Sequence, residues 1–359
     1  MRPLALALLL SLPGAPLAAR TPAPPAPRVQ TGDLQGAPWR IDMPAHWNGE
    51  LVMIAHGFEP SGVPRQTPWP ADQATPALLA AGYAVAQSGY ARQGWAVADG
   101  IADTDRLRAH FIATHPRTHK TWIIGYSMGG AIAIGSLERL PRHYDGGVAL
   151  CGANLPGLTI AGEVLTTTVA FDYFFPDTPG LPPEGLASPH AAPVPQGEMY
   201  QAIDRALQAR PDVARLLATR LQVQEDQLAG AISLHALVLR ELSQRVGGRA
   251  AGNLDTVYTG FGDDAAFNAG VKRYAADPAA TTTARQTLDL TGALRRPLVL
   301  QFNHADPSIP ARFEPVYPQL AAAAGATPAP RRLPSAGEGH CGFSSEQVVA
   351  ALQAVATMR

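Results

Sequence analysis

The segment 119–140 constrains this 359-residue chain more than any other, because a strand, a tight turn and a helix follow one another there. The run HKTWIIG over 119–125 is apolar and strand-like, and residues 131–140 have helical character that ends at a proline. The turn between them has the G-x-S-x-G pattern Gly125-Tyr126-Ser127-Met128-Gly129. Glycine at both ends of the pattern suits a turn too tight for side chains. The sequence therefore predicts that Ser127 stands exposed where a strand meets a helix N-terminus.

Strand-like runs alternate with helical patterns on both sides of this segment. The expected strands lie at 39–43, 50–55, 82–88, 147–150 and 297–302, and the expected helices include 101–115 and 344–358. Apolar strands that alternate with helices indicate a mostly parallel, twisted sheet with helices on both faces. We therefore expect an α/β fold whose core consists of residues 31–152 and 292–359.

The stretch 153–291 lacks this alternation and is expected to be a mainly helical insertion between two core strands. We expect it to open with a Pro-rich loop over 175–195 and then to form helices over 200–208, 212–221 and 224–246.

Residues 1–19 have the order of a secretory signal peptide: a charged start, an apolar Leu/Ala run and small residues for cleavage. The apolar run is shorter than the roughly 20 residues that a membrane span requires. An uncleaved anchor is the alternative. Residues 20–30 follow as a Pro-rich leader. We expect a secreted or periplasmic protein without a membrane span once the signal has been removed.

Charge and cysteine content narrow the classes of partner. Lys and Arg number 28 against 29 Asp and Glu, so the basic excess that drives nucleic-acid binding is absent. The two cysteines, Cys151 and Cys341, are too few for a Cys₄ zinc site, and export makes a disulfide between them permissible. Two buried free thiols are the alternative. These counts argue against nucleic acid as a partner and against a structural Cys₄ zinc site.

The sequence resembles the α/β-hydrolase superfamily over 39–150 and 297–358. The resemblance rests on four local features in the family's order, namely His56-Gly57, the Ser127 turn, Asp306 and His340. A serine hydroxyl needs a base within hydrogen-bond reach, and the base needs an orienting carboxylate. The resemblance thus implies Ser127 as nucleophile, His340 as base and Asp306 as acid. Glu338 is the rival acid by its closeness to His340 in sequence.

The resemblance also implies an oxyanion hole formed by the backbone N–H groups of Met128 and Phe58. Gly57 would allow the chain to approach closely, and His56 would brace the same loop. An insertion in the place of 153–291 is where the superfamily often carries a cap over the site. Aromatic side chains are the candidates for a substrate pocket, with core packing as the alternative: Tyr126, Phe171, Tyr173 and Phe174, with Phe58, Tyr90 and Trp95 equally ambiguous.

These expectations describe a serine hydrolase that cleaves carboxylic esters through an acyl-enzyme. The expected partner is a small-molecule ester, and neither a metal nor an organic cofactor is expected. One alternative keeps the same three residues but cleaves peptides, with a free amine held by acidic residues of the insertion: Glu163, Asp172 and Glu184 are available. The other alternative is a non-catalytic binding protein on the same fold.

Overall fold

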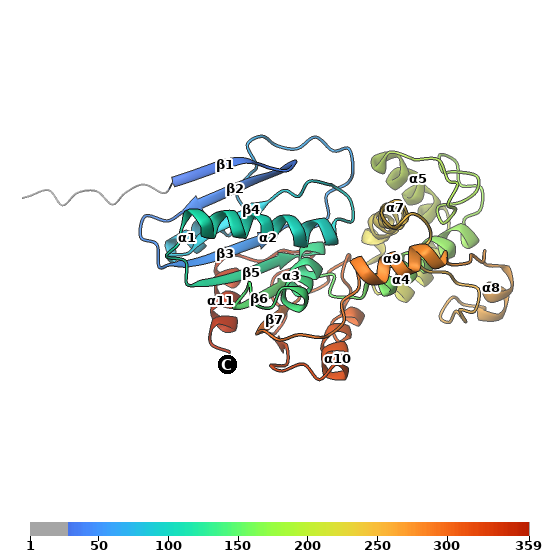
Figure 1. Cartoon of the computed structure of the whole chain (residues 1–359). Helices are drawn as coiled ribbons and strands as arrows, with labels where there is room; N and C mark the ends of the chain where they lie inside the picture. Colours follow the sequence, from blue (N-terminus) through green and yellow to red (C-terminus); the bar gives the residue numbers. More distant parts are fainter. Residues whose placement is uncertain (1–27, 359) are drawn as a thin grey trace, which may run out of the picture.

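The computed structural model describes residues 28–358, and one eight-stranded sheet forms its centre (Figure 1). The strands are β1 (Arg28–Leu34), β2 (Ala37–Met43), β3 (Glu50–Ala55), β4 (Ala84–Ser88), β5 (Lys120–Tyr126), β6 (Gly146–Leu150), β7 (Leu298–Gln301) and β8 (Arg331–Arg332). Their order across the sheet is β1-β2-β4-β3-β5-β6-β7-β8. β2 is antiparallel to β1 and β4, and the other neighbouring pairs are parallel.

Helices cover both faces of the sheet. α2 (Val97–Thr114) and α3 (Met128–Arg139) contact one face, and α1 (Thr75–Ala80) and α11 (Ser345–Ala356) contact the other. Successive residues of a strand point to opposite faces, so Met53 and Ile123 belong to the first core cluster while Val52 and Ile124 belong to the second. α10 (Val316–Ala323) and a short 3₁₀ turn, η2 (Ala311–Phe313), lie between β7 and β8. The predicted α/β class is confirmed.

The register of the parallel strands brings four strand ends to one edge of the sheet. Ala55 of β3 pairs with Gly125 of β5, and Leu150 of β6 pairs with both Tyr126 and Gln301. The residues that follow these strands therefore emerge side by side. Open parallel sheets bind ligands at this carboxyl edge.

Helices gather beyond that edge in the segment between β6 and β7 (Figure 1). They are α4 (Gly157–Phe174), α5 (Gln196–Ala209), α6 (Pro211–Leu221), η1 (Glu225–Gln227), α7 (Leu228–Val246), α8 (Asp264–Gly270) and α9 (Pro278–Thr287). The expectation that this segment opens with a Pro-rich loop was wrong, because α4 precedes that loop. α4 packs against α7 and α9 and buries apolar residues on most of its surface, so it lacks the one-sided pattern that marks a surface helix.

The N-terminal part of the structure begins earlier than expected. β1 starts at Arg28, three residues before the predicted start of the core at residue 31, because residues 28–34 pair with β2 along its whole length. The predicted signal peptide and the rest of the leader lie outside the described residues. Within residues 28–358, no helix combines the length and the apolar character needed to cross a membrane.

Candidate active site

Ser127 lies at the junction of β5 and α3, in a backbone conformation that side-chain-bearing residues rarely adopt. Its φ is 53° and its ψ is −121°, a strained combination of the kind that clusters at functional sites. Glycine is required on both sides: a Cβ on Gly125 would lie 1.9 Å from the Gly129 oxygen, and one on Gly129 would lie 2.0 Å from the Ala55 oxygen. The backbones at Gly125, Gly129 and Ala55 thus pack closely, and Ser127 lies in this tight turn at the carboxyl edge of the sheet.

Ser127, His340 and Asp306 form a continuous hydrogen-bonded series. His340 Nε2 lies 2.9 Å from Ser127 Oγ, and Nδ1 lies 2.9 Å and 3.0 Å from the two Asp306 oxygens. Asp306 is buried, and its Oδ1 also accepts the backbone N–H groups of Ser308 and Ile309 at 2.8 Å and 3.0 Å. The carboxylate is therefore fixed by its own loop, and it in turn fixes the imidazole with Nε2 toward the serine. Glu338 is exposed, and no hydrogen bond joins it to His340.

The loop that carries His340 is tied to the sheet at two places. Cys341 is bonded to Cys151, the residue that follows β6, so of the two alternatives for these cysteines the disulfide is the one present. Buried Asn303, just after β7, accepts the Cys341 N–H at 3.0 Å and donates to the Ala336 oxygen at 2.7 Å. Sequence reasoning missed Asn303, whose two partners lie 33 and 38 residues away.

The backbones of Met128 and of the loop after β3 both lie beside Ser127. Met128 is the first residue of α3, and the first N–H groups of a helix have no partner within it. The loop after β3 passes close by, because a Cβ on Gly57 would lie only 3.1 Å from Ser127 Cβ. Gly57 thus leads directly into Phe58, the other expected donor.

His56 holds this second loop in place. Its Nδ1 bonds the Gly57 oxygen at 2.9 Å, and its ring stacks on Tyr90 with ring centres 4.0 Å apart. The Tyr90 hydroxyl donates to the His56 oxygen at 3.2 Å. Burial lowers the pKa of His56 to about 4, so the ring is neutral at neutral pH. These contacts tie the His56 ring to Gly57 and Tyr90.

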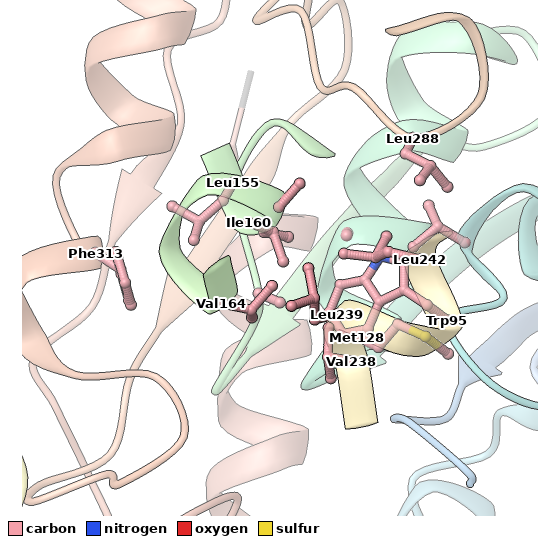
Figure 2. Packing of buried hydrophobic residues seen from close by; sticks show 14 of the residues in the cluster. Trp95, Met128, Leu155, Ile160, Val164, Val238, Leu239, Leu242, Leu288 and Phe313 are labelled. Carbon is pink, nitrogen blue, oxygen red and sulfur yellow. The ribbon is translucent and has the colours of Figure 1, made fainter. Parts of the chain in front are cut away.

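A cavity of about 70 Å³ opens onto Ser127. Residues from the core loops, α4 and α7 line it: Phe58, Trp95, Ala153, Leu155, Ile160, Glu163, Val164, Leu234, His235, Val238, Ser308, Ile309 and Phe313. Ile160, Val164 and Val238 belong to the same apolar cluster as Met128 and Trp95 (Figure 2). The walls are mostly apolar, so the cavity suits an uncharged group.

The four aromatic residues expected to form the pocket do not line this cavity. Phe171 is buried against Phe175, with ring centres 5.0 Å apart, and Tyr173 and Phe174 pack around Phe267 of α8. Tyr126 is buried in the apolar cluster on the opposite face of the sheet from Met128. These four side chains pack into apolar clusters and do not line the cavity, because their positions on the strand and the helix direct them away from Ser127. Phe58 and Trp95 do line the cavity, whereas Tyr90 does not.

Of the polar residues that line the cavity, Ser127 and Glu163 were singled out from the sequence, whereas His235 and Ser308 were not. His235 of α7 hydrogen-bonds Thr167 of α4, and Glu163 forms an ion pair with Arg312 at 3.3 Å. Asp172 instead accepts two backbone N–H groups of the Pro-rich loop. Among residues 28–358, no group of three His, Cys, Asp or Glu side chains is arranged to hold a metal ion.

Comparisons with known proteins give only distant structural likeness. No family model and no curated protein matches the sequence. Similar solved structures include an acylaminoacyl peptidase from Pyrococcus horikoshii, with 11% identity, a TM-score of 0.44 and 88% of this chain covered. A puromycin hydrolase has 16% identity, a TM-score of 0.47 and 92% of this chain covered. The chain spans 37% and 38% of the length of these two proteins.

A bacterial membrane phospholipase A is similar over 92% of this chain and 87% of its own, with 14% identity and a TM-score of 0.43. The architecture of the chain is nevertheless plain from its own sheet. From β4 to β8 across the sheet all neighbouring strands are parallel, helices cover both faces, and the serine occupies a strand–turn–helix ahead of the acid and the histidine in chain order. The chain has the α/β-hydrolase fold that its sequence resembles.

Proposed function

We propose that this chain is a serine hydrolase that cleaves a carboxylic ester. Ser127 Oγ attacks the ester carbonyl while His340 Nε2 takes its proton, and Asp306 stabilises the resulting imidazolium. The N–H groups of Met128 and Phe58 hold the oxyanion. His340 then gives the proton to the leaving alcohol. In deacylation His340 takes a proton from water as the water oxygen attacks the acyl carbonyl, and it passes that proton to Ser127 Oγ as the acid leaves. No metal or organic cofactor takes part in this scheme.

The series of hydrogen bonds from Asp306 through His340 to Ser127 carries the proposal. A binding protein has no need of a strained serine at a helix N-terminus that is already paired with an oriented imidazole. An ester is favoured over a peptide with a free α-amine, because the acidic residues expected to hold that amine are not assembled around Ser127. Only Glu163 of the three candidates lines the cavity, and Arg312 pairs with it.

The compartment proposed for the enzyme is outside the cytoplasm. Residues 153–291 are proposed to act as a cap over the active site. The Cys151–Cys341 bridge supports an oxidising compartment, in line with the signal-like start of the sequence. Side chains of α4 and α7 in the wall of the cavity support the cap role.

Hydrolysis of p-nitrophenyl acetate by the wild-type chain and by Ser127→Ala tests this function. We expect the variant to lose at least about ten-thousand-fold in kcat, because the attacking oxygen is gone. Ser345→Ala, a change in α11, is the matched control and should leave kcat unchanged. Equal activity of Ser127→Ala and wild type would refute the proposed mechanism.

A further inference from the structure

His235 brings an imidazole into the wall of the cavity beside Ser127, where most other wall residues are apolar. Burial and, to a lesser extent, the positive charge of Arg312 lower the pKa of His235 to about 4. The ring is therefore neutral at neutral pH. It offers a hydrogen-bonding group, and not a charge, to whatever occupies the cavity.

The hydrogen bonds of α4 determine which ring nitrogen holds the proton. Thr167 Oγ1 lies 2.8 Å from His235 Nδ1 and 3.1 Å from the backbone oxygen of Glu163. The flanking Thr166 and Thr168 donate to carbonyls four residues earlier at 2.8 Å and 2.9 Å, the usual bond of a helical threonine. Thr167 likewise donates its hydroxyl hydrogen to the backbone oxygen of Glu163. A lone pair of the Thr167 hydroxyl oxygen therefore accepts the hydrogen bond from Nδ1–H of His235.

Nε2 of His235 then carries a lone pair and no proton. It has no hydrogen-bond partner among residues 28–358, and it is not one of the buried polar atoms closed off from solvent. Glu163, the charged neighbour, is engaged with Arg312 at 3.3 Å. His235 therefore offers an uncharged acceptor within mostly apolar walls. Besides Ser127, Ser308 is the other hydroxyl-bearing residue of the lining.

We propose that His235 is a specificity-determining residue that accepts a hydrogen bond from a hydroxyl or N–H on the substrate group seated in this cavity. The proposal rests on the serine hydrolase function proposed above. A hydrocarbon group would displace water from Nε2 and leave it unpaired, which costs binding in the transition state. The favoured substrates are therefore esters whose short carbon chain carries a donor, rather than plain alkyl esters.

Matched ester pairs measured with the full chain test the proposal and show which half of the ester the cavity takes. The acyl arm compares p-nitrophenyl 3-hydroxybutanoate with p-nitrophenyl butanoate, and the alcohol arm compares 3-hydroxybutyl acetate with butyl acetate. In one arm we expect wild type to favour the hydroxylated ester by about tenfold in kcat/KM. His235→Phe should bring this ratio to about one, whereas His190→Phe, an exposed histidine outside the cavity, should leave it unchanged.

Thr167 provides a second test that leaves the imidazole in place. Thr167→Val removes the acceptor that holds the proton on Nδ1, so the preference for the hydroxylated ester should fall. Thr167→Ser retains the hydroxyl and should keep that preference. A ratio near one for wild type in both arms, with ester cleavage intact, would overturn the role of His235 and leave the hydrolase function standing. A His235→Phe variant that keeps the wild-type ratio would do the same. Failure to cleave any ester, together with no reaction with a fluorophosphonate, would overturn both proposals.

Discussion

At the scale of single residues, the choice of the acid beside His340 depends on geometry rather than on closeness in sequence. Glu338 is two positions from the histidine but exposed, whereas Asp306 is buried and hydrogen-bonded to Nδ1 from 34 residues away. Asp306→Asn should lower kcat by about ten-thousand-fold with little change in KM, because an amide no longer holds the productive tautomer. Steady-state kinetics on p-nitrophenyl acetate measure this.

Glu338→Gln is the matched control for the acid and should keep kcat within about twofold of wild type, as an exposed side chain without a structural partner allows. The assignment of Asp306 fails if Glu338→Gln loses activity while Asp306→Asn keeps it.

Candidate catalytic residues could be predicted from the sequence where nearby glycines or a preceding strand indicate the local backbone structure. Ser127 and His340 both lie among glycines that tight turns require, and Asp306 follows a recognisable strand. His235 carries no such mark, because it lies within an ordinary helix and its partner Thr167 is 68 residues away. The aromatic run at 171–175 was wrongly expected to line a substrate pocket, because composition does not tell which way a helical side chain points.

At the scale of elements, the turn between β5 and α3 depends on glycine for space. Gly125→Ala would place a Cβ 1.9 Å from a backbone oxygen, and we expect it to lower the free energy of unfolding by roughly 3 kcal/mol or more. Gly162 is the matched control, since it lies in α4 and a Cβ added to it would meet no atom within 4 Å. Gly162→Ala should therefore raise the free energy of unfolding by about 1 kcal/mol through helix propensity. Urea unfolding of both variants checks the opposite signs, and equal effects would contradict this account of the turn.

Core strands were predictable as elements because the sheet is buried on both faces and its strands read as apolar runs. The expected strands at 50–55, 82–88 and 147–150 coincide with β3, β4 and β6 to within two residues. α4 was not predictable in this way. It is buried on most sides and carries three consecutive threonines, so neither a one-sided pattern nor high helix propensity distinguishes it.

At the scale of the whole molecule, two connections hold the histidine loop and the helical segment to the core. The disulfide joins positions 190 residues apart, from the end of β6 to the residue after His340. α4 and α7 share one apolar cluster with the sheet, which includes Met128, Ile160 and Val238 (Figure 2). The site is therefore assembled from the first core segment, the helical segment and the last core segment together.

Two partly buried histidines with lowered pKa values make the stability of the whole fold depend on pH. The pKa values of His56 and His235 are lowered to about 4, whereas an unfolded histidine titrates near 6.5. Between these values the unfolded chain binds more protons, so the free energy of unfolding should fall as the pH drops from about 6.5 toward 4. Urea midpoints across this window should show a shallower pH dependence for His56→Gln than for wild type. His190→Gln, at an exposed position, should keep the wild-type slope, and an unchanged slope in His56→Gln would contradict the burial argument.

The central claim, that His340 activates Ser127 as a nucleophile, is tested most directly by intact-mass and peptide mass spectrometry after reaction with a fluorophosphonate. We expect one phosphonyl group per chain, located on Ser127, in the wild-type protein, and no adduct on Ser127→Ala. Labelling of His340→Ala should be slower by orders of magnitude, because the hydroxyl then lacks its base. An unlabelled wild-type protein, or an adduct on another residue that persists in Ser127→Ala, would contradict the account.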